Sequence, residues 1–271
     1  MISTLKIATW NILHGTFRED ILEGLYFLIT KAGTGVICLQ EAETRHAGNI
    51  LAFLEEKGLA FWKLEALEAK PTGAELIVLY DSTCLRIVGP PQLWLMPVLA
   101  KKPLLQRMFG RKGVPYIQRA AMATNFLLGG KPIRITTAHL AFEGGVAHCK
   151  HQLNTLAKIF RGSSVEREVL CGDFNTTSFL PGENWRKQKV VEQALGPDFV
   201  NANPKLPWSF SLATIDPNEP MAFLRHVPPW IRKRLRSRTD YVFGKGMRVA
   251  GGEAFDLAGS DHRAVIGTFE A

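Results

Sequence analysis

Polar residues of the kinds that bind metals and move protons stand at the ends of apolar runs in this sequence. Asp173 and Asn175 follow the run EVLCG, and extended backbone would place both on one face, since side chains alternate along a strand. A buried carboxylate without a partner is unfavourable, so this pair belongs either to an ordinary turn or to a site. The other polar residues at the ends of apolar runs are Asn11, Gln40, Glu41, His139, Asp240, Asp261 and His262.

This set contains the groups of an oxygen-ligand metal site together with acid–base groups. Glu41 and Asp261 offer carboxylates and Asn11 offers an amide oxygen, a small ligand set that suits Mg²⁺ or Mn²⁺ with water completing the shell. The spacing of the cysteines and histidines does not suit zinc. Two histidines, His139 and His262, suit phosphate binding and proton transfer when each is held by a carboxylate.

Each of these residues also has a purely structural interpretation. The alternatives are a turn at Asn11, an exposed strand end at Glu41, a hydrogen-bonded core histidine at His139, an ion pair of Asp240 with Arg236 or Arg238, and a cap at Ser260-Asp261-His262. The functional interpretation is favoured because the residues together supply the groups of one reaction.

The elements that must position these residues alternate between strands and helices. Apolar runs predict strands at 5–10, 36–40, 75–80, 84–88, 120–128, 132–140 and 168–174, with a last pair near 239–244 and 263–270. Helical spacing of apolar residues predicts helices at 19–31, 49–57 and 149–160. The strands around Asp81-Ser82 read as a pair, and Gly129-Gly130 is a hairpin signal. This pattern indicates an α/β fold with mixed sheets.

Length, charge and cysteine usage set wider bounds on the protein. The chain has 271 residues, is 46% hydrophobic and carries a net charge of +8, which suits an anionic partner such as nucleic acid, an anionic membrane surface or a phosphorylated substrate. Four cysteines without regular spacing favour reduced thiols and a cytoplasmic location. We expect no signal peptide and no membrane span, and the sequence gives no reason to infer an obligate protein partner.

The motifs TWNILHG, CLQEAE, TTAHL, CGDFNTT, RTDYVFG and GSDHRAV, in this order, resemble those of the endonuclease/exonuclease/phosphatase superfamily, which includes deoxyribonuclease-like enzymes. The motifs run from the first predicted strand to the last. The resemblance implies an α/β (α+β) fold, a four-layer sandwich in which two mixed sheets lie face to face and are flanked by helices. It also implies one domain over residues 1–271, with irregular insertions near 89–116 and 204–238.

The resemblance further implies a role for each motif residue. Glu41 would be the principal metal ligand, with Asn11 and Asp261 close to the metal. Asp173 would deprotonate the attacking water, and Asn175 would hydrogen-bond the phosphate or that water. His262 and His139 would each contact a phosphoryl oxygen. Asp240 would be the carboxylate partner of His262, and Glu75 is a looser match for the partner of His139. Arg119 would contact the substrate.

The resemblance implies a Mg²⁺- or Mn²⁺-dependent hydrolysis of a phosphodiester, and it leaves the substrate open. The basic run from Arg232 and Arg234 to Arg238, the net charge and the aromatic Trp208 favour a nuclease that acts on DNA. The alternative is a phosphodiesterase or phosphatase for phospholipid head groups or small phosphorylated metabolites, because the apolar and basic segment 93–109 would suit a membrane interface. A binding module without activity is disfavoured, since none of the main ligands is missing.

Overall fold

Consecutive buried residues form the central strands, and both faces of these strands lie in apolar cores. Every residue of β2, Val36–Gln40, is buried, so the segment reads as a continuous apolar run and not as an alternating one.

The structure is a computed structural model, and it describes residues 4–13, 18–69, 74–98, 119–141, 145–176, 183–211, 228 and 236–270.

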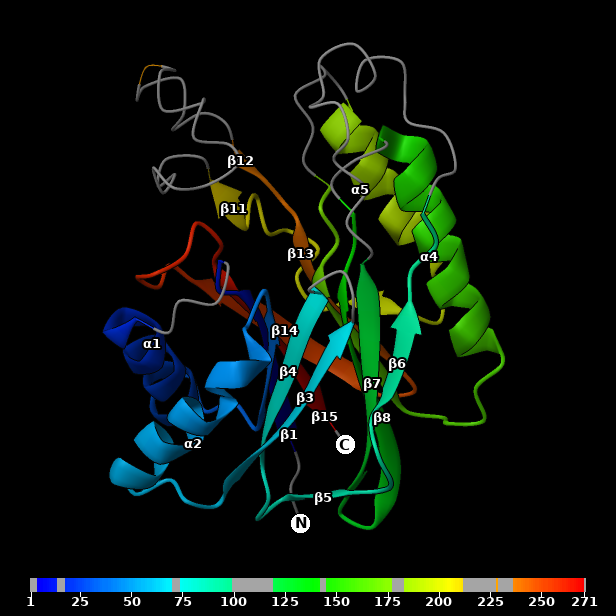
Figure 1. Cartoon of the computed structure of the whole chain (residues 1–271). Coiled ribbons are helices and arrows are strands. Elements are labelled where there is room, and N and C mark those ends of the chain that lie inside the picture. Colours follow the sequence, from blue (N-terminus) through cyan, green and yellow to red (C-terminus); the bar gives the residue numbers. More distant parts are fainter. Residues whose placement is uncertain are drawn as a thin grey trace.

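Two large mixed sheets lie face to face (Figure 1). The first has the order β14-β15-β1-β2-β4-β3, with β1 and β2 parallel and the other neighbours antiparallel. Its strands besides β2 are β1 Thr4–Asn11, β3 Trp62–Ala69, β4 Ala74–Asp81, β14 Arg248–Phe255 and β15 Ala264–Glu270.

The second sheet has the order β10-β13-β9-β8-β7-β5, and β6 also pairs with β7. Here β8 and β9 are the parallel pair. Its strands are β5 Leu85–Ile87, β6 Gln92–Leu95, β7 Ala120–Leu128, β8 Lys131–His139, β9 Glu168–Asp173, β10 Val200–Asn201 and β13 Asp240–Lys245. A separate short pair joins β11 Phe210–Ser211 to β12 Arg236–Ser237.

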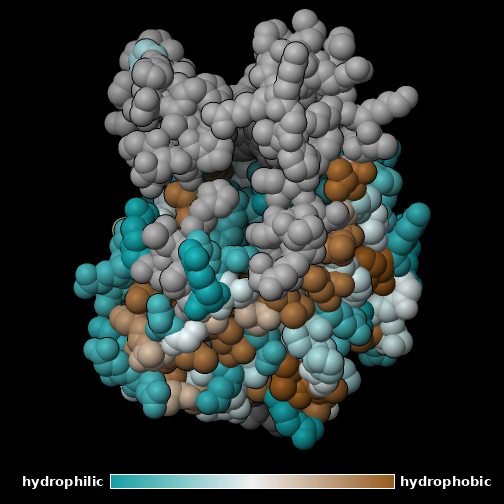
Figure 2. Space-filling view, viewed as in Figure 1, coloured by the Kyte–Doolittle hydropathy of each residue, from teal (hydrophilic) through white to brown (hydrophobic). Residues whose placement is uncertain are grey.

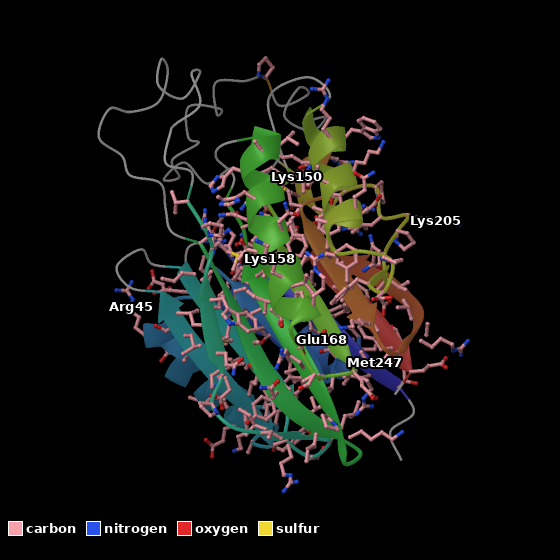
Figure 3. The ribbon with its side chains drawn as sticks, turned by 90° about the vertical axis from the view of Figure 1, so that its right-hand side faces the viewer. Arg45, Lys150, Lys158, Glu168, Lys205 and Met247 are labelled. Carbon is pink, nitrogen blue, oxygen red and sulfur yellow. The ribbon has the colours of Figure 1, made fainter. Side chains whose placement is uncertain are left out.

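Helices cover the outer face of each sheet and complete four layers (Figure 1). Along β1, Ile7 packs in the central core between the sheets, whereas Trp10 packs in the outer core with α1 and α2. On the other side α4 and α5 lie side by side over the second sheet (Figure 3), and a third apolar cluster joins them to it. The helices are α1 Glu19–Thr30, α2 Ala47–Glu56, α4 Gly145–Arg161 and α5 Glu183–Ala194, with a 3-10 turn at Thr44–His46. The predicted four-layer sandwich of two mixed sheets is therefore confirmed.

The outer surface of the described part mixes hydrophilic and hydrophobic side chains in the view of Figure 2, as expected when the apolar layers are internal. None of the helices in the described ranges combines the length and the apolar character that crossing a bilayer requires.

Two strand pairings differ from those that the sequence predicts, while the hairpin is confirmed. β7 and β8 pair across Gly129-Gly130, and both glycines have positive φ values, 59° and 82°. In contrast, β4 and β5 do not pair, because a turn at Asp81–Cys84 carries the chain from the first sheet to the second. The last predicted pair is also divided between the sheets, since β13 pairs with β9 whereas β15 pairs with β1. Strands buried on both faces carry no alternation that could assign them to one sheet.

The two segments predicted to be irregular contain some regular structure. The first begins with strand β6, and residues 99–118 lie outside the described part of the chain. The second contains β11 and β12, and residues 212–227 and 229–235 lie outside the described part.

A glycine inside β9 allows two strands to approach closely at the end of the second sheet. Gly172 has φ 138°, and a Cβ atom there would lie 1.9 Å from the Ala138 carbonyl oxygen. We expect Gly172→Ala to lower the free energy of unfolding by more than about 3 kcal/mol, because backbone cannot yield as a flexible side chain can. Urea unfolding measures this. The matched control is Gly251→Ala, since Gly251 has φ 144° with nothing within 4 Å. An equal loss in both variants would mean that backbone strain, and not the close approach, is responsible.

Candidate active site

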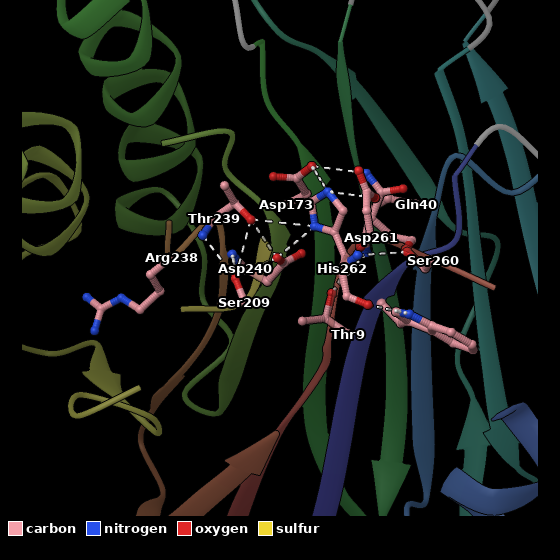
Figure 4. Close-up of polar contacts among 12 residues, drawn as sticks. Thr9, Gln40, Asp173, Ser209, Arg238, Thr239, Asp240, Ser260, Asp261 and His262 are labelled. Carbon is pink, nitrogen blue, oxygen red and sulfur yellow. Dashed lines mark hydrogen bonds and ion pairs between the residues drawn. The ribbon is translucent and has the colours of Figure 1, made fainter. Parts of the chain in front are cut away.

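The predicted site residues meet at one end of the sandwich because the parallel strands of both sheets end there (Figure 4). In the first sheet Asn11 pairs with Gln40 at the ends of β1 and β2, and in the second sheet His139 pairs with Asp173 at the ends of β8 and β9. Asp240, at the start of the antiparallel β13, pairs with Asp173 from the other side. Carboxyl ends of parallel strands are where α/β enzymes usually place their sites.

Both carboxylate oxygens of the buried Asp173 accept hydrogen bonds. Its Oδ2 accepts a hydrogen bond of 3.0 Å from Asn11 Nδ2, and its Oδ1 accepts one of 2.8 Å from the backbone N–H of Asn175. Asn175 has φ 47° and donates its own side-chain amide to the Leu140 carbonyl at 2.8 Å. Burial raises the pKa of Asp173 to about 7, and this effect exceeds the opposing charge of His262. A carboxylate with such a pKa can accept a proton near neutral pH.

His262 is held by Asp240, as the carboxylate–histidine interpretation requires. Nδ1 of His262 lies 2.9 Å from Asp240 Oδ2, and its Nε2 lies 3.9 Å from Asp173 Oδ2 and 3.8 Å from Asp261 Oδ1. Burial alone would lower the pKa of His262, yet the charges of Asp240, Asp173 and Asp261 raise it well above its usual value. The imidazole is therefore cationic, with Nε2–H directed toward the space between two carboxylates. The alternative partners of Asp240 are otherwise engaged: Arg238 pairs with Glu192, and Arg236 lies over Trp208.

Ser209 is part of the site, although no sequence signal points to it. Its hydroxyl donates to Asp240 Oδ2 at 2.7 Å and accepts from the backbone N–H groups of Thr239 and Asp240 at 3.0 and 2.9 Å. Thr239 Oγ1 also donates to Asp240 Oδ2 at 2.7 Å (Figure 4). The carboxylate that orients His262 is thus itself oriented by a fully buried serine 31 residues earlier in the chain. A lone serine in PWSFS resembles any loop serine, so only the fold reveals this role.

We expect Ser209→Ala to lower kcat about tenfold or more while KM changes little. The variant removes one hydrogen bond to a charged group and leaves two buried N–H donors without their acceptor, each an effect of about 1–3 kcal/mol. Steady-state kinetics with a small phosphodiester, together with the Tm, measures both consequences.

A double variant with Asp240→Asn separates a positioning role from a general loss of stability. If Ser209 acts through Asp240, the double variant loses little more activity than Asp240→Asn alone. Losses that add in log kcat would argue against this coupling.

Two further polar residues, Ser260 and Gln40, form hydrogen bonds that support the site from the first sheet. Ser260 donates to the Asn11 carbonyl at 2.6 Å and accepts from the backbone N–H of His262 at 3.0 Å. Gln40 Nε2 donates to Thr9 at 3.0 Å and, across the central core, to Thr137 at 2.8 Å. Gln40 thereby joins the two sheets directly beneath the catalytic end. Glu168, at the other end of β9, lies far from this region (Figure 3).

Glu41 reaches the site through an unusual backbone conformation. Strand alternation after Gln40 would direct Glu41 toward the helix side, but its φ of 53° changes that direction. Its Oε1 lies 3.5 Å from His139 Nε2 and 4.0 Å from Arg119 Nη1. A left-handed conformation in a residue other than glycine costs about 1–3 kcal/mol and is concentrated at functional sites. The positive φ of Glu41 therefore favours a functional position over an ordinary strand end.

Arg119 fixes the tautomer of His139. Its Nη1 lies 3.1 Å from His139 Nδ1. A guanidinium group only donates, so Nδ1 accepts and the neutral imidazole carries its proton on Nε2. That nitrogen faces Glu41 Oε1 at 3.5 Å and Asp173 Oδ2 at 3.6 Å. His139 is thus a neutral hydrogen-bond donor at the side of the site opposite His262.

The oxygen atoms around Glu41 and Asp261 fit a divalent cation. Oδ1 of Asp261 is buried and accepts no hydrogen bond from the described residues. Burial raises the pKa of Asp261 to about 6; the charge of His262 opposes this, while the charge of Glu41 adds to it. Two carboxylates that repel one another, one with an unsatisfied buried oxygen, have the chemistry of an Mg²⁺ or Mn²⁺ site. Asn11 adds an amide oxygen, which accepts from the Leu13 N–H at 3.0 Å and retains a second lone pair.

Asp173, Asp240 and His262 form another cluster whose ligand atoms lie within 4.8 Å of one another. Their atoms are already used in hydrogen bonds, since His262 Nδ1 faces Asp240 and both oxygens of Asp173 accept from asparagines. The described hydrogen bonds therefore engage the atoms of this cluster, whereas Asp261 Oδ1 accepts none from the described residues.

The remaining predicted substrate-binding residues are Glu75, Trp208, Arg232 and Arg234. Glu75 precedes Leu76, which pairs with Gln40; alternation gives Glu75 the face that Ile77 presents to the helices, so its pairing with His139 stays a prediction. Trp208 directly precedes Ser209 and lies beneath two arginines. Arg232 and Arg234 lie outside the described residues.

Neither a family model nor any curated protein sequence matches the chain. Solved structures do. An endonuclease/exonuclease/phosphatase from Bacteroides vulgatus has a TM-score of 0.69 at 15% identity and covers 99% of both chains. D. rerio TDP2 complexed with a single-strand DNA product gives 0.67 at 14% identity, over 99% of this chain and 100% of that one. Bacteroides thetaiotaomicron mannosyl-6-phosphatase Bt3783 gives 0.63 at 15% identity, over 98% and 100%. The chain therefore has the fold of the endonuclease/exonuclease/phosphatase superfamily, as its motifs indicate.

Proposed function

We propose that this protein is an Mg²⁺- or Mn²⁺-dependent phosphoester hydrolase in which water attacks a phosphodiester. The observation that carries the proposal is a row of neighbouring side chains at the ends of both sheets: Glu41, His139, Asp173, His262 and Asp261. Asp173 Oδ2 lies 3.6 Å from His139 Nε2 and 3.9 Å from His262 Nε2, while Glu41 Oε1 and Asp261 Oδ1 lie 3.5 and 3.8 Å from the same two nitrogens. Burial raises the pKa of Asp173 to about 7, and the neighbouring carboxylates raise the pKa of His262 well above its usual value. Water activation, phosphate neutralisation and metal binding are the requirements of this reaction.

Asp173 takes the proton of the attacking water. Asn11 and Asn175 hold one carboxylate oxygen each, so the base cannot rotate away from the phosphorus. A base of this kind contributes typically about 10²–10⁴ to the rate.

Positive charge for the phosphoryl oxygens comes from His262 and from Arg119, and His139 adds a neutral hydrogen-bond donor. His262 donates from Nε2 as a cation held by Asp240, while His139 donates from Nε2 as a neutral imidazole held by Arg119. A divalent cation bound by Glu41, Asp261 and Asn11 would supply Lewis-acid stabilisation of the charge that develops on the phosphate.

A nuclease acting on DNA is the substrate assignment that we favour. The net charge of +8 supports it, as does the similarity to a structure complexed with a single-strand DNA product. A phosphatase or phosphodiesterase for small phosphorylated metabolites or lipid head groups is the second candidate, supported by the similarity to the mannosyl-6-phosphatase structure. A cytoplasmic location accords with the free cysteines and stays a proposal.

A substrate panel tests the assignment. Purified protein with 5 mM Mg²⁺, about the order of saturation for weak Mg²⁺ sites, is given a single-stranded oligonucleotide, plasmid DNA, bis-p-nitrophenyl phosphate, mannose 6-phosphate and sphingomyelin vesicles. We expect hydrolysis of bis-p-nitrophenyl phosphate and a higher kcat/KM for DNA. A higher kcat/KM for the sugar phosphate or the lipid would replace the nuclease assignment, and no hydrolysis of any substrate would overturn the proposed function.

A further inference from the structure

Two arginines pack over one tryptophan, on chain segments that adjoin Asp240 and His262. The guanidinium carbon of Arg236 lies 4.4 Å from the centroid of the Trp208 ring, and that of Arg263 lies 4.8 Å from it. We call these three side chains the arginine–tryptophan stack. Each contact lies within the range in which the aromatic ring attracts a cation. Trp208 is therefore covered by guanidinium groups, a setting different from that of an open ring on which a base would stack.

Neither arginine is neutralised by the described part of the chain. Other arginines have acidic partners, such as Arg238 with Glu192 and Arg248 with Glu270, whereas no carboxylate of the described residues pairs with Arg236 or Arg263. Arg263 donates one N–H to the Ala254 carbonyl at 2.8 Å, and Arg236 is exposed. Two positive charges brought to one ring repel each other, so an anion would stabilise the stack.

The stack is connected by short paths to the catalytic residues. Trp208 precedes Ser209, which holds Asp240, and Arg263 follows His262. The backbone N–H of Arg263 donates to the Ser209 carbonyl at 2.7 Å, so the two chain segments are joined. Arg236 pairs with Ser211, whose N–H donates to the Asp261 carbonyl at 3.1 Å. Every member of the stack is thus fixed to a segment that also carries the site.

Stacking restrains the arginines before a ligand arrives. A planar guanidinium presents parallel N–H groups that match two phosphate oxygens, and a pre-ordered side chain loses less entropy on binding. A single scissile phosphate is already surrounded by His262, His139 and Arg119 in the proposed site, so a second set of arginines implies a second phosphate.

We propose that the arginine–tryptophan stack binds a phosphate that flanks the one being hydrolysed, and that the substrate is therefore a chain with more than one phosphate, a nucleic acid strand. This inference rests on the proposed function for the position of the scissile phosphate. Direct contact with phosphate, not base stacking on Trp208, provides the recognition.

Binding is measured separately from hydrolysis. An Asp173→Asn background prevents cleavage, and the dissociation constant for a ten-nucleotide single strand is measured from 50 to 200 mM salt. Arg236→Gln is added to this background, with Arg86→Gln as a control of equal charge change. Arg86 is exposed on β5, in the part of the second sheet distant from the site (Figure 1). A thermal unfolding scan verifies that each variant is folded.

We expect Arg236→Gln to weaken binding about tenfold at 50 mM salt, the loss of a hydrogen-bonded charge contact. It should also flatten the salt dependence by about 0.7 in log–log slope, the value for one phosphate contact on a single strand. Arg86→Gln should leave the slope unchanged.

Equal losses in both variants would mean that binding follows net charge alone, and unchanged binding in Arg236→Gln would exclude the stack from recognition; either result overturns the inference. Loss of binding to phosphatidylserine vesicles, with oligonucleotide binding unchanged, would also overturn it, in favour of a lipid surface. If the Asp173→Asn protein binds no oligonucleotide while the wild type hydrolyses bis-p-nitrophenyl phosphate, this inference fails and the proposed function stands. If no substrate is hydrolysed but Arg236 governs oligonucleotide binding, the proposed function fails.

Discussion

Asp173→Asn should lower kcat for bis-p-nitrophenyl phosphate by about 10³, within the range that a positioned general base contributes. The amide keeps the size and shape of the carboxylate but cannot accept the proton of water. Asp173 lies at the centre of the row, between Asn11, Asn175 and Nε2 of His262. KM should change much less than kcat, because this side chain acts on the water and only indirectly on the phosphate.

The same variant should keep or raise the thermal stability of the metal-free chain. The pKa of Asp173 in the folded state is about 7, which is above the ordinary pKa of an aspartate. Ionisation of Asp173 therefore lowers the stability of the folded chain at every pH above that ordinary pKa. A neutral side chain removes this cost at pH 8. Asp198→Asn, at an exposed position, is the control. Wild-type kcat in Asp173→Asn would exclude Asp173 as the base, and loss of both kcat and Tm would indicate a structural role instead.

Glu41→Gln should weaken Mn²⁺ binding about 100-fold or more, since even the loss of a residue behind a metal ligand costs about 10–100-fold. Two observations support this expectation: the positive φ of Glu41, which departs from strand alternation, and the buried Asp261 Oδ1, which accepts no hydrogen bond from the described residues. Isothermal titration with Mn²⁺ measures the affinity directly, without reference to turnover. Mg²⁺-dependent kcat/KM should fall in parallel.

Glu43→Gln is the matched control, because Glu43 lies two residues further along and pairs with Arg45, away from the row. It should bind Mn²⁺ as the wild type does. Equal weakening in both variants would show only a general effect of negative charge. Unchanged Mn²⁺ affinity in Glu41→Gln would move the cation to another ligand set, and the cluster of Asp173, Asp240 and His262 would be the first to consider.

The candidate residues could be found from the sequence because they follow apolar runs, and an apolar run locates the end of a strand. The run VICLQ is the strand Val36–Gln40 in full, and the residue after it is Glu41. Strand ends are local features. The identity of the carboxylate beside His262 could also be anticipated, since RTDYVFG resembles a known motif with Asp240 in this place.

The features that could not be found depend on contacts between distant segments. Ser209 holds Asp240 across 31 residues, and nothing in its neighbours distinguishes it from a loop serine. The exchange of β5 into the second sheet follows from the turn after β4 and not from any pattern in the strand. The positive φ of Glu41 could not be anticipated either, because glutamate has no intrinsic preference for it.

We propose that one end of this sandwich hydrolyses phosphoesters with the help of a divalent cation. The most direct test of this proposal is the initial rate of bis-p-nitrophenyl phosphate hydrolysis by chelator-treated protein as Mg²⁺ or Mn²⁺ is added back. We predict a rate at the level of buffer without metal, then a saturable rise that Asp173→Asn does not show. A rate that persists in the chelator would contradict the need for a metal ion. A rate that stays at the buffer level at every metal concentration would contradict phosphoester hydrolysis at this site.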